Sequence, residues 1–296
     1  MQPLEQLGPF FSGSRIGFLL LHGLAGTPAE MKIIGNRLNR YGFTVLCPRL
    51  AGHCSSEEEL IATRWTDWAA SAERSFEALS QRMDAVFVGG LSAGAVLSLR
   101  LARRQPTVRG LALYSTTLRY DGWTIPKLSF LLPLILKLPY FGTRYRFEEA
   151  FPYGIKNDKL RQRILASMQS GDAEAAGFTA TPGAALRQLW GLVAEVKREL
   201  PRITSPALLI HARNDDIASM RNALYVRDHL GAASELLLLD ESYHMVTVDQ
   251  ERNKVCDATA RFARKFLSET ERAELDSHAR QVCPEDTEAL CEEVGT

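Results

Sequence analysis

The sequence Gly90-Leu91-Ser92-Ala93-Gly94 follows directly after the apolar run Ala85–Gly89 and leads into a helical pattern. A strand, a sharp turn and a helix in this order form a nucleophile elbow, which leaves the serine hydroxyl exposed. The flanking glycines are needed because a Cβ at either position would strike the neighbouring strand or helix. The helix expected over Ala93–Arg104 has an apolar face and is ended by Pro106. The stretch therefore predicts Ser92 as a nucleophile.

Short apolar runs like the one before the elbow recur along the chain, and helical patterns separate most of them. These runs are Ile16–Leu21, Phe43–Cys47, Ala85–Gly89, Gly110–Ser115, Ala207–Ala212 and Glu235–Leu239. Their nearly continuous hydrophobicity is typical of parallel strands that are covered on both faces. Alternating strands and helices imply right-handed crossovers. The expected fold class is α/β, with an open, mostly parallel central sheet flanked by helices.

The first predicted helix opens at Thr27-Pro28-Ala29-Glu30, a capping box with proline at the first helical position, and it ends at Gly42. The capping box assigns Thr27 and Glu30 to the start of this helix. Further helices are expected at about 66–83, 183–199, 220–230 and 251–267.

The alternation of strands and helices stops between Thr116 and about Pro206, where no convincing strand is found. Connections of this length are rarely structureless in compact domains. Residues 118–199 are therefore expected to form a helical cap or lid, with its return helix, inserted into an α/β core of residues 1–117 and 200–267. Within the cap, the Ala- and Gly-rich stretch Asp172–Thr181 is interpreted as a mobile link.

Beyond Leu267 the chain turns acidic and loses its apolar period. Residues 268–296 are expected to form an acidic C-terminal extension that begins as a helix and frays into disorder.

Composition narrows the possible partners and compartments of the chain. Of its 296 residues, 46% are hydrophobic and 24% are charged, and 35 basic residues balance 35 acidic ones. Such a balance indicates neither a nucleic-acid surface nor a polybasic membrane anchor. Five cysteines match neither a disulfide framework nor a zinc spacing, and residues 1–9 lack the features of a signal peptide. The expected location is cytoplasmic.

The segment Trp123–Phe141 is apolar and about long enough to cross a bilayer. Lys127, Lys137 and three prolines interrupt it. A spanning helix would bury these charges and lose backbone hydrogen bonds, so no transmembrane segment is expected.

A serine nucleophile needs a base within hydrogen-bond reach, and the base needs a carboxylate that orients it. Sheet-based serine hydrolases supply these groups in the order Ser, Asp or Glu, then His, each in a loop after a strand. Here Asp215 follows the strand Ala207–Ala212, and His244 follows the strand Glu235–Leu239. Ser92, Asp215 and His244 are therefore predicted as a catalytic triad at the carboxyl ends of the strands.

Other acidic residues lie close to the predicted acid in the sequence. Asp216 competes with Asp215, which is preferred because it lies closer to the strand end. Asp240 and Asp249 are interpreted as solvated or capping residues.

Acyl transfer also requires two donors for an oxyanion. One is expected to be the backbone N–H of Ala93, directly after the nucleophile. The other is expected in the loop His22-Gly23-Leu24-Ala25-Gly26, where the Leu24 N–H is the candidate. His22 precedes this turn and is interpreted as a structural hydrogen-bonding residue, and His211 as a core residue. For His53, lining of the pocket mouth and a structural role are left as equal alternatives.

With these residues in place, the chain resembles the α/β-hydrolase superfamily, and within it bacterial carboxylesterases of the monoacylglycerol lipase type. The resemblance is carried by Pro9-Phe10-Phe11 with Leu19–Gly26, by Gly89–Gly94, by Ala212–Asp216 and by Tyr243–Glu251. It covers about residues 9–267 and implies the same triad and oxyanion-hole residues. Ala95 departs from the second glycine that is common in the elbow helix of such esterases.

The function expected from these features is hydrolysis of carboxylic esters, of medium- to long-chain acyl esters or monoacylglycerols, through an acyl-enzyme. No metal or organic cofactor is expected, and the partner is a small ester or lipid substrate. A thioesterase, an amidase, a carbon–carbon bond hydrolase or a cofactor-free haloperoxidase would use the same triad. A non-catalytic homologue that binds a ligand is the alternative outside the enzyme class.

Overall fold

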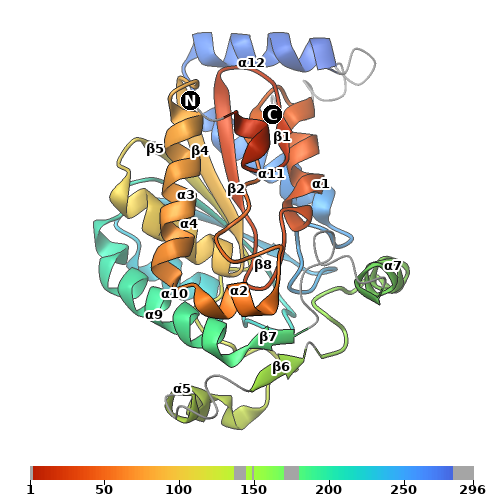
Figure 1. Ribbon diagram of the computed structural model, residues 1–296. Coiled ribbons are helices and arrows are strands. Elements are labelled where there is room, and N and C mark those ends of the chain that lie inside the picture. The colour runs from red at the N-terminus through yellow and green to blue at the C-terminus, as the bar shows by residue number, and fades with distance from the viewer. Residues whose placement is uncertain (1–2, 137–144, 149, 170–179, 283–296) are drawn as a thin grey trace.

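A twisted central sheet runs through the molecule in the computed structural model, which describes residues 3–136, 145–148, 150–169 and 180–282 (Figure 1). Within these residues the main sheet has seven strands in the order β1-β3-β2-β4-β5-β8-β9. The strands are β1 Phe10–Phe11, β2 Ile16–Leu21, β3 Thr44–Leu46, β4 Ala85–Leu91, β5 Val108–Tyr114, β8 Ala207–Ala212 and β9 Ser234–Leu239. All pairs are parallel except β1 with β3. The predicted α/β class with a mostly parallel sheet is confirmed.

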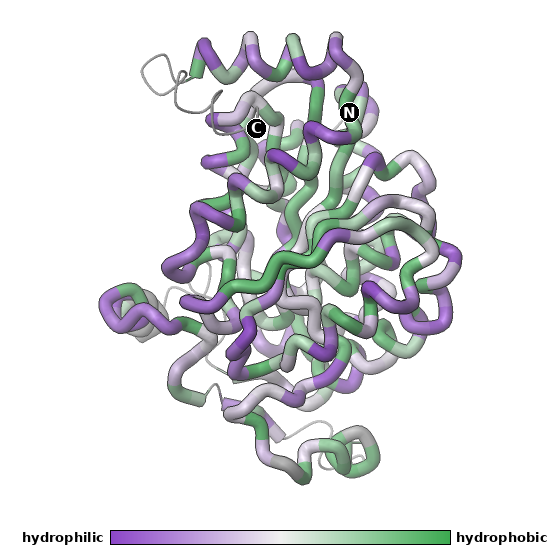
Figure 2. Tube along the Cα trace, turned by 180° about the vertical axis from the view of Figure 1, so that it is seen from behind, coloured by the Kyte–Doolittle hydropathy of each residue, from purple (hydrophilic) through white to green (hydrophobic). Residues whose placement is uncertain are grey.

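Helices cover both faces of this sheet, which explains why its strands are apolar on both sides. The flanking helices are α1 Ala29–Arg40, α3 Trp65–Ser80, α4 Ala93–Arg104, α9 Gly183–Glu199, α10 Arg221–His229 and α11 Arg252–Lys265. Along β2, Leu19 and Leu21 belong to a core cluster shared with α3, α4 and α9. Phe18 and Leu20 belong to a second cluster shared with α1 and α11. Figure 2 shows the resulting hydrophobic colour along the central strands.

Residues 118–199, which are expected to form a cap, lie between β5 and β8 and contain short elements where the structure describes them. These are η2 Lys127–Leu131, α5 Leu132–Ile135, β6 Arg146–Glu148, α7 Asp158–Gln169 and β7 Ala180–Pro182, followed by α9. The expectation that this stretch holds no strand was wrong, because β6 and β7 pair antiparallel with Phe147 opposite Thr181. Strands of three residues are too short to show a period of two. Residues 172–179 of the link predicted as mobile lie outside the described residues.

Two helices and two short turns complete the described chain. The helix α2 Glu57–Ala62 and the turns η1 Leu4–Gln6 and η3 Leu200–Arg202 have no counterpart among the predicted elements. The C-terminal extension begins with α12 Glu269–Val282, whose Leu275 is fully buried in the core. Residues 283–296, where fraying was expected, lie outside the described residues. Within the described ranges, none of the helices combines the length and apolar character needed to cross a membrane.

Candidate active site

The turn that carries Ser92 lies between β4 and α4 and has a strained backbone. Ser92 has φ 57° and ψ −112°, a conformation that non-glycine residues rarely adopt. A Cβ on Gly90 would lie 2.3 Å from the carbonyl carbon of Gly94, and one on Gly94 would lie 2.2 Å from the oxygen of Leu21. Both glycines are therefore required by close backbone approach, for the reason that the sequence predicts.

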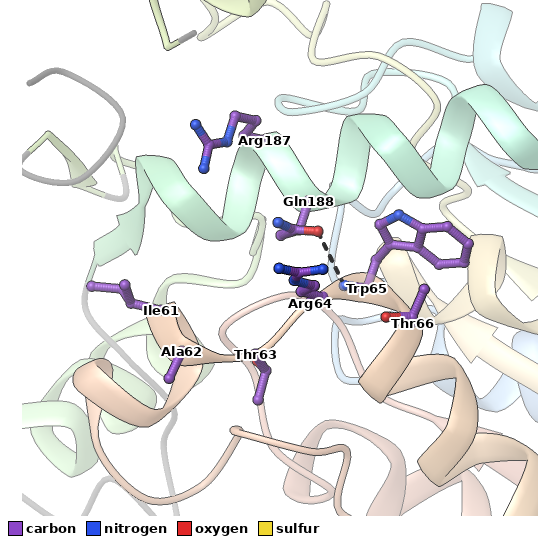
Figure 3. A pocket seen from close by; sticks show the side chains of 8 residues that line it. All are labelled: Ile61, Ala62, Thr63, Arg64, Trp65, Thr66, Arg187 and Gln188. Carbon is purple, nitrogen blue, oxygen red and sulfur yellow. Dashed lines mark hydrogen bonds between the residues drawn. The ribbon is translucent and has the colours of Figure 1, made fainter. Parts of the chain in front are cut away.

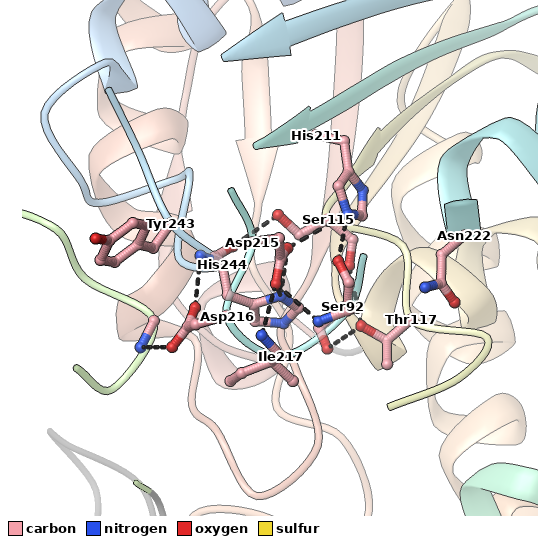
Figure 4. A network of polar contacts seen from close by, with 12 residues as sticks. Ser92, Ser115, Thr117, His211, Asp215, Asp216, Ile217, Asn222, Tyr243 and His244 are labelled. Atoms are coloured by element: carbon pink, nitrogen blue, oxygen red, sulfur yellow. Dashed lines mark hydrogen bonds and ion pairs between the residues drawn. The ribbon is translucent and has the colours of Figure 1, made fainter. Parts of the chain in front are cut away.

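The imidazole of His244 and the carboxylate of Asp215 meet in the loops that follow β9 and β8 (Figure 4). His244 Nδ1 lies 2.8 Å from Asp215 Oδ2 and 3.0 Å from Oδ1. Asp215 Oδ1 also accepts the backbone N–H groups of Ile217 and Ala218 at 2.8 and 2.7 Å. Both side chains are buried. The arrangement fixes the imidazole so that Nε2 is left for a reacting group.

The charges of this pair stabilise each other in spite of burial. Burial raises the pKa of Asp215, but the attraction of His244 and its hydrogen bond outweigh this effect and hold the pKa below its usual value. Burial lowers the pKa of His244, yet the carboxylate of Asp215 outweighs burial and leaves the pKa raised. An imidazole tuned in this way is suited to take up a proton and hold it beside the carboxylate.

A pH dependence follows from the raised pKa of His244. A general base must be neutral, so kcat/KM is expected to rise with pH through the pKa of His244 in the free protein. Because that pKa lies above the ordinary value of 6.5, the midpoint of the acid limb is expected above pH 6.5. Ester hydrolysis at substrate concentrations below KM, measured from pH 5 to 9, tests this. A midpoint below 6.5 in the unmodified protein contradicts the assignment.

The hydroxyl of Ser92 has a partner that sequence reasoning missed. Ser92 Oγ lies 3.0 Å from Thr117 Oγ1, and no hydrogen bond joins it to His244 among the described residues. Thr117 donates its proton to the Ser115 carbonyl at 3.1 Å, so Ser92 is the donor to Thr117. Ser115 Oγ donates to the His244 carbonyl at 2.6 Å. Residues 115–117 follow β5 and so reach the same edge of the sheet, which is the only sequence signal that points to them.

The loop His22–Gly26 lies against the elbow, and its hydrogen bonds orient one peptide group. The Gly23 carbonyl accepts hydrogen bonds from His22 Nδ1 at 2.9 Å and from the Gly26 N–H at 3.3 Å. Because a trans peptide points its C=O and N–H in opposite directions, the Leu24 N–H faces away from these donors. A Cβ on Gly23 would lie 3.8 Å from the Cβ of Ser92, which places this peptide beside Ser92.

His22 is buried and neutral, in keeping with the structural role expected for it. Burial, followed by the charge of His53, lowers the pKa of His22 to about 3. With Nδ1–H donated to Gly23, its Nε2 accepts the Leu50 N–H at 3.3 Å. His53 is also buried, and its ring packs edge-on against those of His22 and Trp68. Of the two roles left open for His53, the structure favours the structural one.

The other candidate residues are placed around the site without touching the imidazole. Asp216 accepts the backbone N–H groups of His244 at 3.2 Å and of Gly154 at 2.9 Å, and burial raises its pKa. His211 is buried with Nε2 2.7 Å from the Ala218 carbonyl, as expected for a core residue, and 3.3 Å from Asp215. Asp240 is exposed and pairs with Arg213.

Asp249 is not solvated, which was one of the two interpretations given for it, the other being a capping residue. It is fully buried, and its carboxylate accepts backbone N–H groups from Tyr243 and Gln250 on one side and from Lys156 and Asn157 of the cap on the other. Sequence pattern misses this role because the donors come from segments about ninety residues apart.

A surface cavity of about 490 Å³ lies elsewhere, between α9 and the segment that joins α2 to α3 (Figure 3). Residues 61–66 line it together with Arg187 and Gln188. Ser92, Asp215 and His244 do not contribute to its walls, so this cavity lies apart from the candidate active site.

A parallel sheet with a serine on a strained strand-to-helix turn, and a paired histidine and aspartate after later strands, defines an α/β-hydrolase. The profile of the Hydrolase_4 family, described as serine aminopeptidase, S33, matches residues 14–251. The chain belongs to this family.

Relatives of the chain include a lipase and an esterase. The chain is 30% identical to a thermostable monoacylglycerol lipase of Bacillus sp. (strain H-257), over 87% of this chain and 94% of the relative. It is 27% identical to a carboxylesterase of Bacillus subtilis (strain 168), over 87% and 96%. A solved structure from work on the metagenome-derived lipolytic enzymes LipS and LipT has a TM-score of 0.73 at 27% identity, covering 87% of this chain and 96% of that one. The chain is an α/β-hydrolase of the esterase and monoacylglycerol lipase type.

Proposed function

We propose that this protein hydrolyses carboxylic esters through Ser92 as nucleophile, His244 as general base and Asp215 as the group that orients the base. The observation that carries the proposal is the buried His244–Asp215 pair, 2.8 Å apart, at the same edge of the sheet as the strained turn of Ser92. A serine hydroxyl is a weak nucleophile until a base takes its proton. The pair supplies that base in the required orientation.

The reaction then proceeds in two acyl-transfer steps. Ser92 Oγ turns from Thr117 to His244 Nε2, gives up its proton and attacks the ester carbonyl. The imidazolium, stabilised by Asp215, returns the proton to the leaving alcohol and leaves an acyl-serine. His244 next takes a proton from water, and the hydroxide formed attacks the acyl carbon. Collapse of this second tetrahedral intermediate releases the acid and returns the proton to Ser92.

The oxyanion of both tetrahedral intermediates is assigned to two backbone donors. The Ala93 N–H belongs to the first turn of α4 and is one of the N–H groups without an acceptor inside the helix. The Leu24 N–H is oriented by the bonds on the Gly23 carbonyl. Fixed donors stabilise the developing charge without reorganisation, and losing one costs about 2.7–4 kcal/mol in the barrier.

The substrate class is argued from the cap. Leu128, Phe130 and Leu134 are each 68% exposed, so the described part of the apolar cap segment leaves large apolar side chains uncovered. A surface of this kind is suited to an acyl chain, and each buried methylene contributes about 0.8 kcal/mol. We infer a preference for medium- to long-chain acyl esters or monoacylglycerols.

A series of p-nitrophenyl esters from acetate to palmitate tests this substrate class. Four additional buried carbons are expected to raise kcat/KM by roughly two orders of magnitude.

Phe130→Ser is expected to reduce the ratio of long-chain to short-chain activity. Ile33→Ser, which replaces an exposed apolar residue of α1, serves as the matched control and leaves the ratio unchanged. Activity that falls steadily beyond butyrate argues against an acyl-binding cap. If a thioester or an amide with the same acyl chain is cleaved faster than the ester, the protein is a thioesterase or an amidase instead.

A further inference from the structure

The carboxylate of Glu30 lies against the loop that carries the Leu24 N–H, although no step of the proposed reaction uses it. Glu30 belongs to the first turn of α1, and its Oε2 accepts the Gly23 N–H at 2.8 Å. Its Oε1 would lie 1.9 Å from a Cβ on Gly26. The side chain is thus turned back between two glycines of the loop, and a side chain at position 26 would displace this carboxylate.

This contact completes a clamp on a single residue. Glu30 holds the N–H of Gly23, while His22 and the Gly26 N–H hold its carbonyl. The same loop contains Ala25 at φ 60°, a left-handed conformation that costs energy for a residue with a Cβ. A loop with two glycines and one strained residue has other accessible conformations, so it needs fixed partners to keep one peptide in place.

Holding a carboxylate in this position is costly, which argues against a purely local role. A capping glutamate serves the helix start equally well when its carboxylate is open to water. Burial raises the pKa of Glu30 to about 7, even though the backbone N–H groups of Gly23 and Thr27 and the charge of His244 all act to lower it. Carboxylates perturbed in this way cluster at functional sites.

We propose that Glu30 is a positioning residue that holds Gly23 by its N–H and thereby keeps the Leu24 N–H, in the next peptide group, directed at the oxyanion. The role rests on the proposed ester hydrolysis and deepens it. Glu30 touches no reacting atom; it acts through the loop. Its negative charge also interacts with His244, the titratable side chain that faces it from the loop after β9 and that Asp215 and Asp216 influence as well.

The test compares Glu30→Ala, which removes the acceptor, with Glu30→Gln, which keeps an oxygen for the Gly23 N–H but removes the charge. Glu30→Ala is expected to lower kcat by about 10²–10³-fold, as loss of an oxyanion donor does, with KM changed less than threefold. Glu30→Gln is expected to retain kcat within tenfold. It should also shift the acid limb of kcat/KM to lower pH, because a negative charge near His244 is lost.

Rates are expressed per active site, counted by titration with a fluorophosphonate, so that misfolded protein does not count as a catalytic loss. If Glu30→Ala does not fold, Glu30→Leu retains most of the volume without the acceptor and replaces it. The proposal is overturned if the variant without the acceptor keeps a kcat per active site within threefold of that of the unmodified protein. It is also overturned if Glu30→Gln loses as much kcat as the variant without the acceptor. Failure of the unmodified protein to hydrolyse any ester or to react with the probe refutes the proposed function itself and is recognised before any variant is made.

Discussion

Replacing Ser92 by alanine is expected to lower kcat for a p-nitrophenyl ester by about 10⁶-fold, close to the loss seen when the serine or the histidine of a serine triad is removed. The variant keeps the oxyanion donors and the His244–Asp215 pair, but it has no nucleophile to form the acyl-enzyme. Steady-state hydrolysis of a soluble short-chain ester, with the uncatalysed rate subtracted, measures the effect. Removing one hydroxyl from an already strained turn is not expected to unfold the protein.

Ser75→Ala is the matched control for this variant. Ser75 is a buried serine of α3 whose hydroxyl donates to the Ser71 carbonyl at 2.9 Å. Its loss is expected to cost about 1 kcal/mol of stability and to leave kcat within threefold. If Ser92→Ala keeps more than a hundredth of the parent activity in a preparation free of contaminating esterase, Ser92 is not the nucleophile.

The second large effect is expected at Asp215, with a contrast at the adjacent residue. Asp215→Asn is expected to lower kcat by about 10⁴-fold, because an amide beside Nδ1 favours the wrong tautomer of His244 and cannot stabilise the imidazolium. Asp216→Asn is expected to lose no more than tenfold, since the hydrogen bonds that its carboxylate accepts from the described residues come from backbone N–H groups, and the variant keeps one acceptor oxygen.

Both aspartate variants are compared with the unmodified protein at the same pH, and their folding is checked by thermal melting. Equal losses at the two positions, or a larger loss at Asp216, would reverse the assignment of the acid.

The central α/β sheet is predictable from sequence because its signals are local. The bounds of α4 and α9 and of β2 and β8 agree with the predicted ranges, since each element has a strong apolar pattern and a clear stop. The short strands β6 and β7 are not predictable in this way. They pair across more than thirty residues, and within three residues a strand has no period to detect.

The candidate site likewise contains residues that the local sequence predicts and residues that it does not. Ser92, Asp215 and His244 each follow a strand, so one topological rule predicts that they share an edge. Thr117 and Asp249 act through hydrogen bonds between distant segments, which no pattern within one segment reveals.

Glu30 shows how a local pattern that predicts where a helix starts leaves a tertiary role unseen. The motif at residues 27–30 does lie at the start of α1, which begins at Ala29, and the Thr27 hydroxyl accepts the Ala29 N–H at 3.2 Å. The carboxylate of Glu30, however, also reaches Gly23 in the loop before the helix. A capping box and a loop clamp use the same residue types, and only the fold distinguishes them.

The most direct test of the central claim is the mass of the intact protein after reaction with a fluorophosphonate, followed by peptide mapping. A single adduct on Ser92 is predicted, with no adduct in Ser92→Ala and a labelling rate reduced by at least a thousandfold in His244→Ala, because the serine then lacks its base. An adduct on another residue, or labelling of Ser92 at an undiminished rate without His244, would contradict the account.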